Sequence, residues 1–339
     1  MKPLIIPIFI SHSGCPHRCI FCDQEKITSQ SVRAVGRNYV WKVLEKAISS
    51  SKFDTRRNPE VAFYGGTFTG LPKDRMTELL EAVSPYIRDR FINSIRVSTR
   101  PDFIDEERLK IMKAFHVRTV ELGVQSLDEE VLSMAQRGHT AGDVIRAVQM
   151  LKRGGFKVGI QLMPGLPGDS EERFRATIEK VIGLNPDMVR LYPALVIEGT
   201  GLARMYAEGS YRPLTLEEGV DLCAQGVTSL ETNGIPVIRI GLMSSPSLLE
   251  EGRIVSGPWH PAFGFLVRSA IHQKAVEPDL PASGTAEGIR IFAPAREISL
   301  IRGYKNRGIR IIEEKTGAKV LGITVDDNLP GGRVRIEKI

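Results

Sequence analysis

The chain has 339 residues, of which 42% are hydrophobic and 25% charged, and its formal net charge at pH 7 is +6. This composition is typical of a globular protein with one large domain and a small second one. It excludes a disulfide framework, since three of only four cysteines share one loop, and no apolar segment approaches the ~20 residues of a membrane span. We therefore expect a cytoplasmic protein with no membrane partner.

The first predicted element is a strand over residues 4–10, which leads directly into the cysteine loop. Pro7 interrupts its apolar run, so the pattern favours a strand over a signal peptide. The loop carries three cysteines at CxxxCxxC spacing, Cys15, Cys19 and Cys22. Three thiolates on one short loop indicate a metal site.

The identity of the metal is open at this point. A cubane iron–sulfur cluster normally takes four thiolates, so three would leave one iron free to bind a substrate or cofactor. Zinc is the alternative, with His12, His17 or Cys223 as its fourth ligand. A loop without metal is the third possibility. Cys223, on a predicted helix beside Leu222, is expected to be a small buried hydrophobe rather than a ligand.

Strands and helices are then predicted to alternate. Helices are expected at 38–50, 73–89, 105–115, 128–135, 141–154 and 170–184, and strands at 61–64, 94–98, 119–123, 157–162, 188–191 and 236–242. Apolar strands that alternate with helices imply a parallel sheet.

Polar or glycine-rich strings follow several of these strands. They are G-G-T-F (65–68), S-T-R-P-D (98–102), G-V-Q-S (123–126), Q-L-M-P-G-L-P-G (161–168) and Y-P-A (192–194). The carboxyl ends of parallel strands are where ligands bind in α/β barrels, although Gly and Pro also simply end strands. Glycines at 65 and 66 would let the backbone approach a ligand closely.

The cysteine loop, with Phe21 before its last cysteine and Gly65-Gly66-Thr67 one strand later, resembles the radical S-adenosylmethionine (SAM) superfamily. The resemblance implies an α/β fold with a partial (β/α)6 TIM-like barrel of the radical SAM type. It also implies a [4Fe-4S] cluster on the three cysteines, with SAM bound at the open iron. In that superfamily the reduced cluster cleaves SAM to a 5′-deoxyadenosyl radical that abstracts a hydrogen atom. An external flavodoxin- or ferredoxin-like electron donor is then expected.

Longer strings resemble the catalytic subunit of Elongator, which modifies wobble uridines of tRNA. They include V-E-L-G-V-Q-S-L-D-E-E-V-L (120–132), R-G-H-T (137–140), M-P-G-L-P-G (163–168) and L-Y-P-A-L-V-I-E-G-T-G-L (191–202). The match runs from about residue 7 to 242. The compact cysteine spacing is instead similar to oxygen-independent coproporphyrinogen III oxidase, and we find no acetyltransferase domain. Elongator's own reaction is therefore not expected of this chain.

Carried over by position, the resemblance implies roles for seven residues around SAM. Phe21 would lie beside the adenine, and Gly65, Gly66 and Thr67 would meet the methionine amino group, with Thr67 standing where many members have Glu. Gln125 and Gln161 would bind the ribose hydroxyls, and Arg137 the methionine carboxylate. The structural alternatives are a surface helix end for Arg137 and a capping amide for Gln125. No catalytic residue is assigned.

The predicted domains are a radical SAM core at 1–243, a connecting segment and linker at 244–287, and a small basic α+β domain at 288–339. Residues 289–339 hold eleven Lys and Arg against six Asp and Glu, so most of the net charge lies there. The segment 301–320 resembles a KH-type RNA-binding element, whose GxxG turn grips the nucleic-acid backbone. Here the turn is Gly303-Tyr304-Lys305-Asn306, which lacks the second Gly.

Lys305, Arg307 and Arg310 are the RNA-contact candidates, and their alternative is a solvated basic face. His260, in an unusual G-P-W-H-P turn, is either a proton donor or a turn residue packed against Trp259.

Three functions remain open. The first is a radical SAM enzyme that acts on RNA, the second is the same chemistry on a small molecule, and the third is a zinc-bound RNA-binding protein without catalysis.

Overall fold

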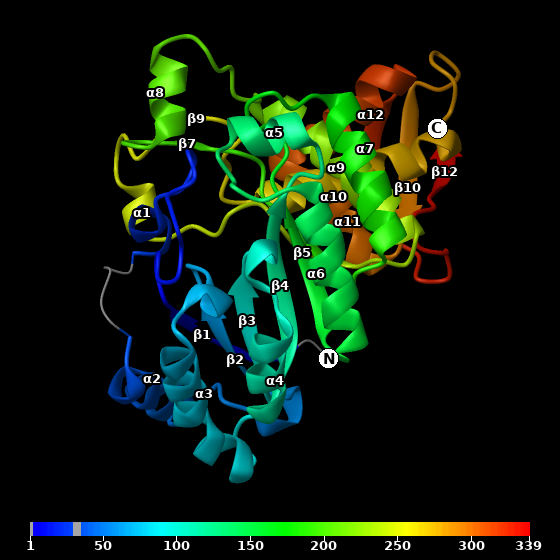
Figure 1. Cartoon of the computed structure of the whole chain (residues 1–339). Helices are drawn as coiled ribbons and strands as arrows, with labels where there is room; N and C mark the ends of the chain where they lie inside the picture. Colours follow the sequence, from blue (N-terminus) through cyan, green and yellow to red (C-terminus); the bar gives the residue numbers. More distant parts are fainter. Residues whose placement is uncertain (1–2, 30–34) are drawn as a thin grey trace. The chain divides into compact units, whose positions relative to one another are not determined.

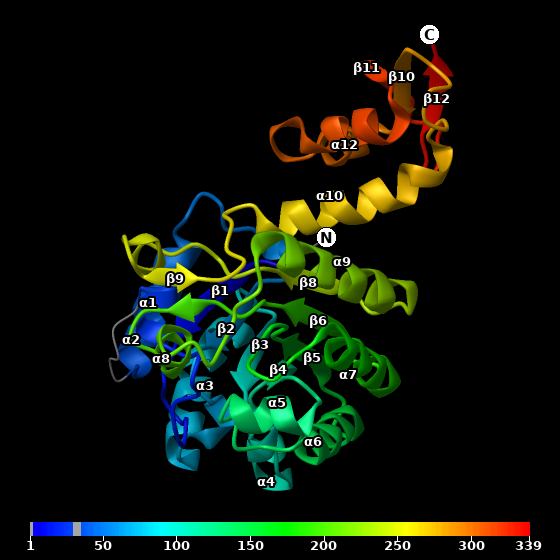
Figure 2. The ribbon, with the colours of Figure 1, turned by 90° about the horizontal axis from the view of Figure 1, so that it is seen from above.

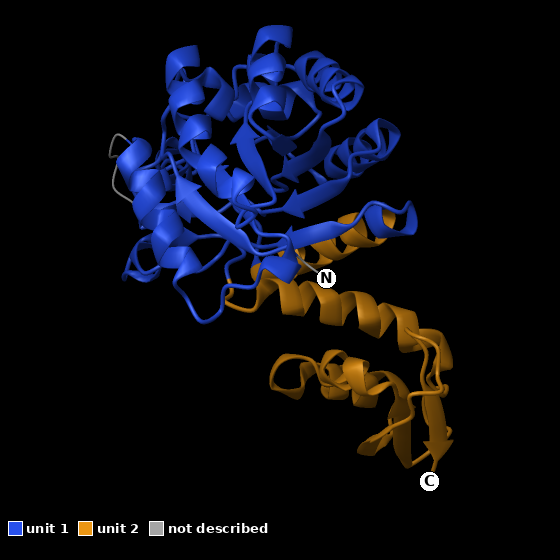
Figure 3. Ribbon diagram, turned by 90° about the horizontal axis from the view of Figure 1, so that it is seen from below, with its two compact units in different colours: residues 1–215, 230–259 blue, residues 216–229, 260–339 orange. Residues whose placement is uncertain are grey.

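The computed structural model describes residues 3–29 and 35–339, and within them the chain forms two compact units (Figure 3). The first unit takes residues 1–215 and 230–259, and the second takes residues 216–229 and 260–339. In the described ranges, none of the helices combines the length and the apolar character needed to cross a bilayer. The predicted domain boundaries at 243 and 287 stay a prediction.

One seven-stranded parallel sheet organises the first unit, in the order β1-β2-β3-β4-β5-β6-β8. Its strands are β1 (Ile5–Phe9), β2 (Glu60–Tyr64), β3 (Ser94–Thr99), β4 (Val117–Gln125), β5 (Lys157–Leu162), β6 (Met188–Leu191) and β8 (Val237–Ile240). The sheet is curved, with helices along its outer side (Figures 1 and 2). The predicted partial TIM-like barrel is confirmed, and β8 extends it by a seventh strand beside β6.

Helices of the first unit connect these strands. They are α1 (Gln24–Thr28), α2 (Arg37–Ile48), α3 (Lys73–Arg88), α4 (Glu106–Ala114), α5 (Glu129–Met134), α6 (Ala141–Arg153), α7 (Glu171–Leu184) and α8 (Gly201–Ala207), while α9 (Leu216–Thr232) is shared between the units. A two-stranded antiparallel sheet that we did not predict pairs β7 (Val196–Ile197) with β9 (Ile254–Ser256). Short 3-10 segments cover Thr55–Arg57, Phe68–Gly70, Pro101–Phe103, Ser247–Leu249, Glu277–Asp279, Ala295–Glu297 and Tyr304–Asn306.

Capping side chains fix where several helices of the first unit begin. Asp105, Asp128, Thr140 and Ser170 each accept a hydrogen bond from a backbone N–H in the first turn of α4, α5, α6 and α7. Such caps satisfy donors that the helix itself leaves unpaired, at a typical gain of about 1 kcal/mol each.

The second unit carries its own small sheet, in the order β11-β10-β12. β10 (Gly288–Ala293) runs parallel to β11 (Lys319–Val325) and antiparallel to β12 (Arg335–Lys338). The helices α10 (Phe263–Val276), α11 (Ile298–Arg302) and α12 (Arg307–Thr316) complete it. Leu280 and Ala286, within the expected linker, pack against the apolar core of this unit.

Candidate active site

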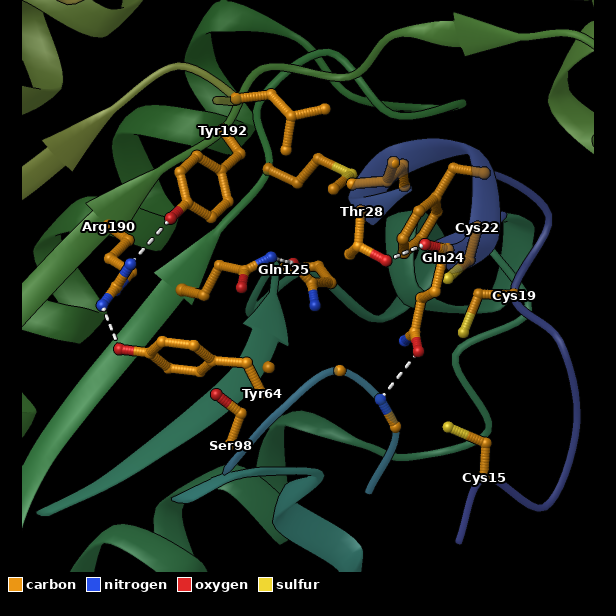
Figure 4. Close-up of a pocket in the computed structure, with 18 of the residues that line it drawn as sticks. Cys15, Cys19, Cys22, Gln24, Thr28, Tyr64, Ser98, Gln125, Arg190 and Tyr192 are labelled. Carbon is orange, nitrogen blue, oxygen red and sulfur yellow. Dashed lines mark hydrogen bonds between the residues drawn. The ribbon is translucent and has the colours of Figure 1, made fainter. Parts of the chain in front are cut away.

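A cavity of about 560 Å³ opens at the carboxyl ends of the first unit's strands (Figure 4). Every predicted metal or cofactor residue lines it: Cys15, Cys19, Phe21, Cys22, Gly65, Gly66, Thr67, Gln125, Arg137 and Gln161. These residues come from the cysteine loop, the ends of β2, β4 and β5, and the segment before α6. The structure therefore brings together residues that lie up to about 150 positions apart in the sequence.

The three thiols line the same wall of the cavity. The Cys15 Sγ lies 3.3 Å from the Thr67 Oγ1, and the Arg137 Nη1 donates to the Cys19 Sγ at 2.9 Å. Burial raises the pKa of Cys15, and burial together with the neighbouring cysteines raises the pKa of Cys22 to about 12. Thiolates are the ligand form of cysteine, so these buried sulfurs need a cationic centre beside them to lose their protons.

Within the described residues no ligand set is gathered in advance, either for zinc or for a cluster on the three cysteines. In the described ranges, no three Cys, His, Asp or Glu side chains gather closely enough to hold one metal ion. The three proposed fourth ligands are engaged elsewhere. His17 Nε2 lies 2.8 Å from the Gln136 carbonyl, His12 Nε2 accepts from the Gln24 N–H at 3.1 Å, and Cys223 is fully buried, as expected for a small hydrophobe.

A reciprocal pair of hydrogen bonds closes the cysteine loop at its two ends. His12 Nε2 accepts the backbone N–H of Gln24, and Gln24 Oε1 accepts the backbone N–H of His12 at 2.6 Å. The same amide oxygen accepts the Gly66 N–H at 2.8 Å, which joins the loop to the turn after β2 (Figure 4). We did not predict this role for Gln24, because its partners are 12 and 42 residues away in the sequence.

The Gly65-Gly66-Thr67 turn packs directly against the cysteine loop. Gly66 has φ +60°, and a Cβ there would lie 2.3 Å from the Ser13 carbonyl oxygen and 2.6 Å from that of Ile10. A Cβ on Gly14 would lie 2.2 Å from the Thr67 carbonyl oxygen. Glycine is therefore required at these two positions so that the two backbones can approach each other.

Gln125 occupies a conformation that L-residues rarely adopt. Its φ is +72°, it is buried, and the register of β4 against β5 shifts between Gly123 and Gln125. Such a bulge re-aims a side chain, and backbone outliers of this kind cluster at functional sites. The Gln161 Nε2 donates to the Gln125 Oε1 at 3.3 Å, so both amides face the cavity together.

Arg137 is buried rather than at a surface helix end, so that structural alternative is wrong. Its guanidinium contacts the Cys19 sulfur and the Gly123 carbonyl oxygen, and its Cζ lies 5.9 Å from the centre of the Phe21 ring. The buried Nε has no hydrogen-bond partner in the described part of the chain. An unpaired buried donor is costly, so this orphaned donor fits a site completed by a bound hydrogen-bond acceptor such as a carboxylate.

Sequence reasoning missed an ionic network deeper in the barrel. Glu121 lies within ion-pair distance of Arg96 at 2.6 Å and of Arg190 at 2.7 Å, and Arg96 also pairs with Glu60 at 2.7 Å. Arg190 donates to the hydroxyls of Tyr64 and Tyr192, both of which line the cavity. Arg96, Glu121 and Arg190 appear in the sequence only as charged residues inside the apolar strands β3, β4 and β6, and no local pattern shows which of them pair.

In the second unit the basic turn has an unusual backbone. Lys305 and Asn306 both have positive φ, +49° and +60°, as does Gly303 at +65°. Asn306 thus takes a left-handed conformation at the position where a GxxG turn has its second glycine, and asparagine is among the residues that tolerate it. Near this turn, Arg307 pairs with Glu217 at 3.2 Å and Arg310 donates to the Lys305 carbonyl oxygen. The RNA contacts of Lys305, Arg307 and Arg310 stay a prediction.

His260 belongs to the same unit as this turn. Its ring meets that of Tyr304 edge-on, with the centroids 4.7 Å apart, and its Nδ1 accepts the Ala262 N–H at 3.0 Å. These contacts hold the His260 ring within the second unit.

Comparisons with known proteins agree with this geometry. The family model described as the radical SAM superfamily matches residues 9–181, and a model of its C-terminal domain matches residues 186–273. A tRNA uridine(34) acetyltransferase of Methanocaldococcus jannaschii is 41% identical over 129 residues, which cover 37% of this chain and 24% of that protein. An uncharacterized protein of the same organism is 28% identical over 295 residues, which cover 85% of this chain and 87% of that protein.

A solved structure of Elp3 from Methanocaldococcus infernus shares the fold, with a TM-score of 0.59 and 24% identity. The match covers 81% of this chain and 64% of that one. The chain spans only about a quarter of the length of the Methanocaldococcus acetyltransferases it matches. The resemblance to the catalytic subunit of Elongator is thus confirmed for the shared part of the chain.

Proposed function

Because the chain belongs to the radical SAM superfamily, we propose that it is a radical SAM enzyme that cleaves SAM at a [4Fe-4S] cluster and acts on RNA. The observation that carries SAM cleavage is that the ten residues implied by the family resemblance all line one cavity. When bound, the reduced cluster supplies the electron that cleaves SAM to a 5′-deoxyadenosyl radical. An external flavodoxin- or ferredoxin-like protein would provide that electron.

The cavity residues have distinct parts in this proposal. Cys15, Cys19 and Cys22 would hold the cluster as thiolates, and Arg137, already within reach of the Cys19 sulfur, would stabilise negative charge there. The Gly66 and Thr67 backbone, fixed against the cysteine loop, would orient the methionine amino group. Phe21 would lie beside the adenine.

The amides of Gln125, which is buried, and Gln161, which is half-buried, would hydrogen-bond the ribose hydroxyls. Each is a neutral hydrogen-bonding group held by packing, as a polar ligand requires in a site that excludes water. The part of Arg137 that faces the carboxylate of SAM would be its unpaired Nε.

RNA is proposed as the substrate on two grounds. Relatives of this chain are named tRNA uridine(34) acetyltransferases, and residues 289–339 carry a net positive charge of five. Positive charge around a backbone-rich turn suits contact with phosphates. A small-molecule substrate for the same chemistry is the alternative.

The test is anaerobic reconstitution with iron and sulfide, reduction, and measurement of 5′-deoxyadenosine formed from SAM with and without cellular tRNA. We expect formation that increases with tRNA and is lost in Cys15→Ser, Cys19→Ser and Cys22→Ser. Cys223→Ser is the matched control, since the fourth thiol is buried and is not one of the residues that line the cavity. Cleavage that ignores tRNA would favour the small-molecule alternative, and no cleavage by the wild type would contradict the proposal.

RNA contact by the basic turn has its own test, the salt dependence of tRNA binding. Neutralising Lys305, Arg307 and Arg310 together as glutamines should weaken binding at low salt and lower the slope of log K against log salt by up to about 2. A control with three exposed basic residues of the first unit neutralised, Lys46, Arg88 and Lys110, should leave the slope unchanged. Equal slopes in both variants would remove the turn from the RNA interface.

A further inference from the structure

The cavity wall is unevenly charged. In the described part of the chain it is lined by five arginines but by a single carboxylate, that of Glu121; the arginines are Arg18, Arg100, Arg137, Arg190 and Arg239. Arg18 is exposed, so its charge is solvated, and Arg100 forms a two-pronged pair with Asp102 at 2.9 and 2.8 Å. The question is which of the remaining arginines is left without a counter-charge.

Arg190 has a counter-charge, because it belongs to a network of ion pairs whose charges sum to zero. Two carboxylates, Glu60 and Glu121, alternate with two guanidiniums, Arg96 and Arg190, along one chain of ion pairs. Each of these four charged groups has a partner of opposite sign. The network therefore has no spare carboxylate for a third arginine.

Of the lining arginines that are not exposed, two have no carboxylate partner among the described residues. Arg137 contacts the Cys19 sulfur and so belongs to the cysteine end, and the other is Arg239. It is the direct partner of Arg190 in the parallel pairing of β6 with β8, and both side chains line the cavity. Among the described residues, no carboxylate lies within ion-pair distance of it, and its one hydrogen bond is a long 3.4 Å contact from Nε to the Gly241 carbonyl oxygen. Like charges on directly paired strand residues are unfavourable, and the one lining carboxylate, Glu121, pairs with Arg190 and not with Arg239.

The arginine also lies at a separate end of the cavity. Figure 4 shows Arg190, Tyr64 and Tyr192 across the cavity from Cys15, Cys19 and Cys22. Arg239 adjoins Arg190 in the sheet, so it belongs to the end away from the cysteines. If the cofactor takes the cysteine end, the other end is left for the substrate.

We propose that Arg239 binds an oxyanion of the substrate, a phosphate or a carboxylate, at the end of the cavity opposite the three cysteines. The proposal deepens the proposed function and rests on it, because it assumes that the cofactor takes the cysteine end. A planar guanidinium with most of its donors free suits two-pronged binding of either oxyanion. The phosphate of a nucleotide in RNA and the carboxylate of a small acid are the two sources of that chemistry.

The experiment measures binding of three probes to the full-length protein reconstituted with iron, sulfide and SAM. The probes are uridine 5′-monophosphate, orotate and uridine, which carry a phosphate, a carboxylate and no anion on related pyrimidines. We expect the wild type to bind at least one of the two anionic probes about 10-fold or more tightly than uridine. The anionic probe with the lower Kd shows whether the site prefers a phosphate or a carboxylate.

In Arg239→Gln, we expect the Kd of the preferred anionic probe to rise about 10- to 100-fold, as for loss of a charged hydrogen bond, with uridine binding unaltered. Arg239→Lys should recover part of the loss. Arg88→Gln, the same charge change on an exposed residue outside the cavity, is the control. Matched iron content and thermal midpoints establish that the variants are folded.

The proposal is overturned if the wild type binds both anionic probes no better than uridine, a result that needs no variant to fold. It is equally overturned if Arg239→Gln loses no more affinity than Arg88→Gln. Failure of the proposed function is a different observation, namely no 5′-deoxyadenosine from the wild type. An active wild type without preference for an anion would defeat only the oxyanion site.

Discussion

Gly66→Ala is expected to be among the most damaging single substitutions in the chain. A Cβ at this position would meet two carbonyl oxygens of the cysteine loop at 2.3 and 2.6 Å, and φ is +60°. Left-handed backbone strain costs about 1–2 kcal/mol for a residue with a Cβ, and overpacking adds typically about 1–3 kcal/mol. We expect the free energy of unfolding to fall by about 2–5 kcal/mol and most reconstituted iron to be lost.

Gly65→Ala is the matched control for this prediction. Gly65 has a similar φ of +73°, but the nearest atom to its Cβ would be the side-chain oxygen of Gln24 at 3.1 Å. It should therefore cost only the strain of about 1–2 kcal/mol. Urea unfolding and iron content of the two variants make the comparison. Equal losses would mean that close approach to the cysteine loop is not what requires glycine at position 66.

Glu121→Ala is the second change with a large expected effect. The carboxylate is buried between Arg96 and Arg190, and its removal leaves the charge of Arg190 without a carboxylate partner in the network. Breaking a buried ion pair from one side costs about 3–5 kcal/mol, because the remaining charge stays desolvated. We expect a loss of unfolding free energy of that size, measured by urea denaturation.

Glu81→Ala provides the reference for an exposed ion pair. Glu81 pairs with Arg37 at 2.9 Å, and both side chains are more than 40% exposed. Exposed pairs contribute about 0–1 kcal/mol. A Glu121→Ala protein as stable as Glu81→Ala would show that the network in the barrel relaxes or admits water, contrary to the packing described above.

Much of the barrel could be predicted from local patterns. The strands 157–162 and 188–191 were predicted with the bounds that the structure has, because each is an apolar run that ends at Pro, Gly or a polar turn. The candidate site was reached through motifs whose spacing is local, such as the cysteine loop and the Gly-Gly turn. Where a strand or a motif is determined by residues close together in the chain, it could be predicted from the sequence.

The remaining features depend on partners far apart in the sequence. Glu121 meets arginines 25 and 69 positions away, and the β7–β9 pairing joins segments of two and three residues. Neither has a local pattern. The same holds for Arg239, whose lack of a carboxylate is visible only once the strands are side by side. The left-handed backbone of Asn306 could not be predicted either, because asparagine tolerates a positive φ but does not require one.

The most direct test of the account is the electron paramagnetic resonance spectrum of the reduced, reconstituted protein with and without SAM. Three cysteines that leave one iron open predict the signal of a reduced [4Fe-4S] cluster whose shape changes when SAM is added. A cluster signal that SAM leaves unaltered would contradict cofactor binding at the open iron. A protein that takes up zinc and gives no cluster signal would contradict the account as a whole.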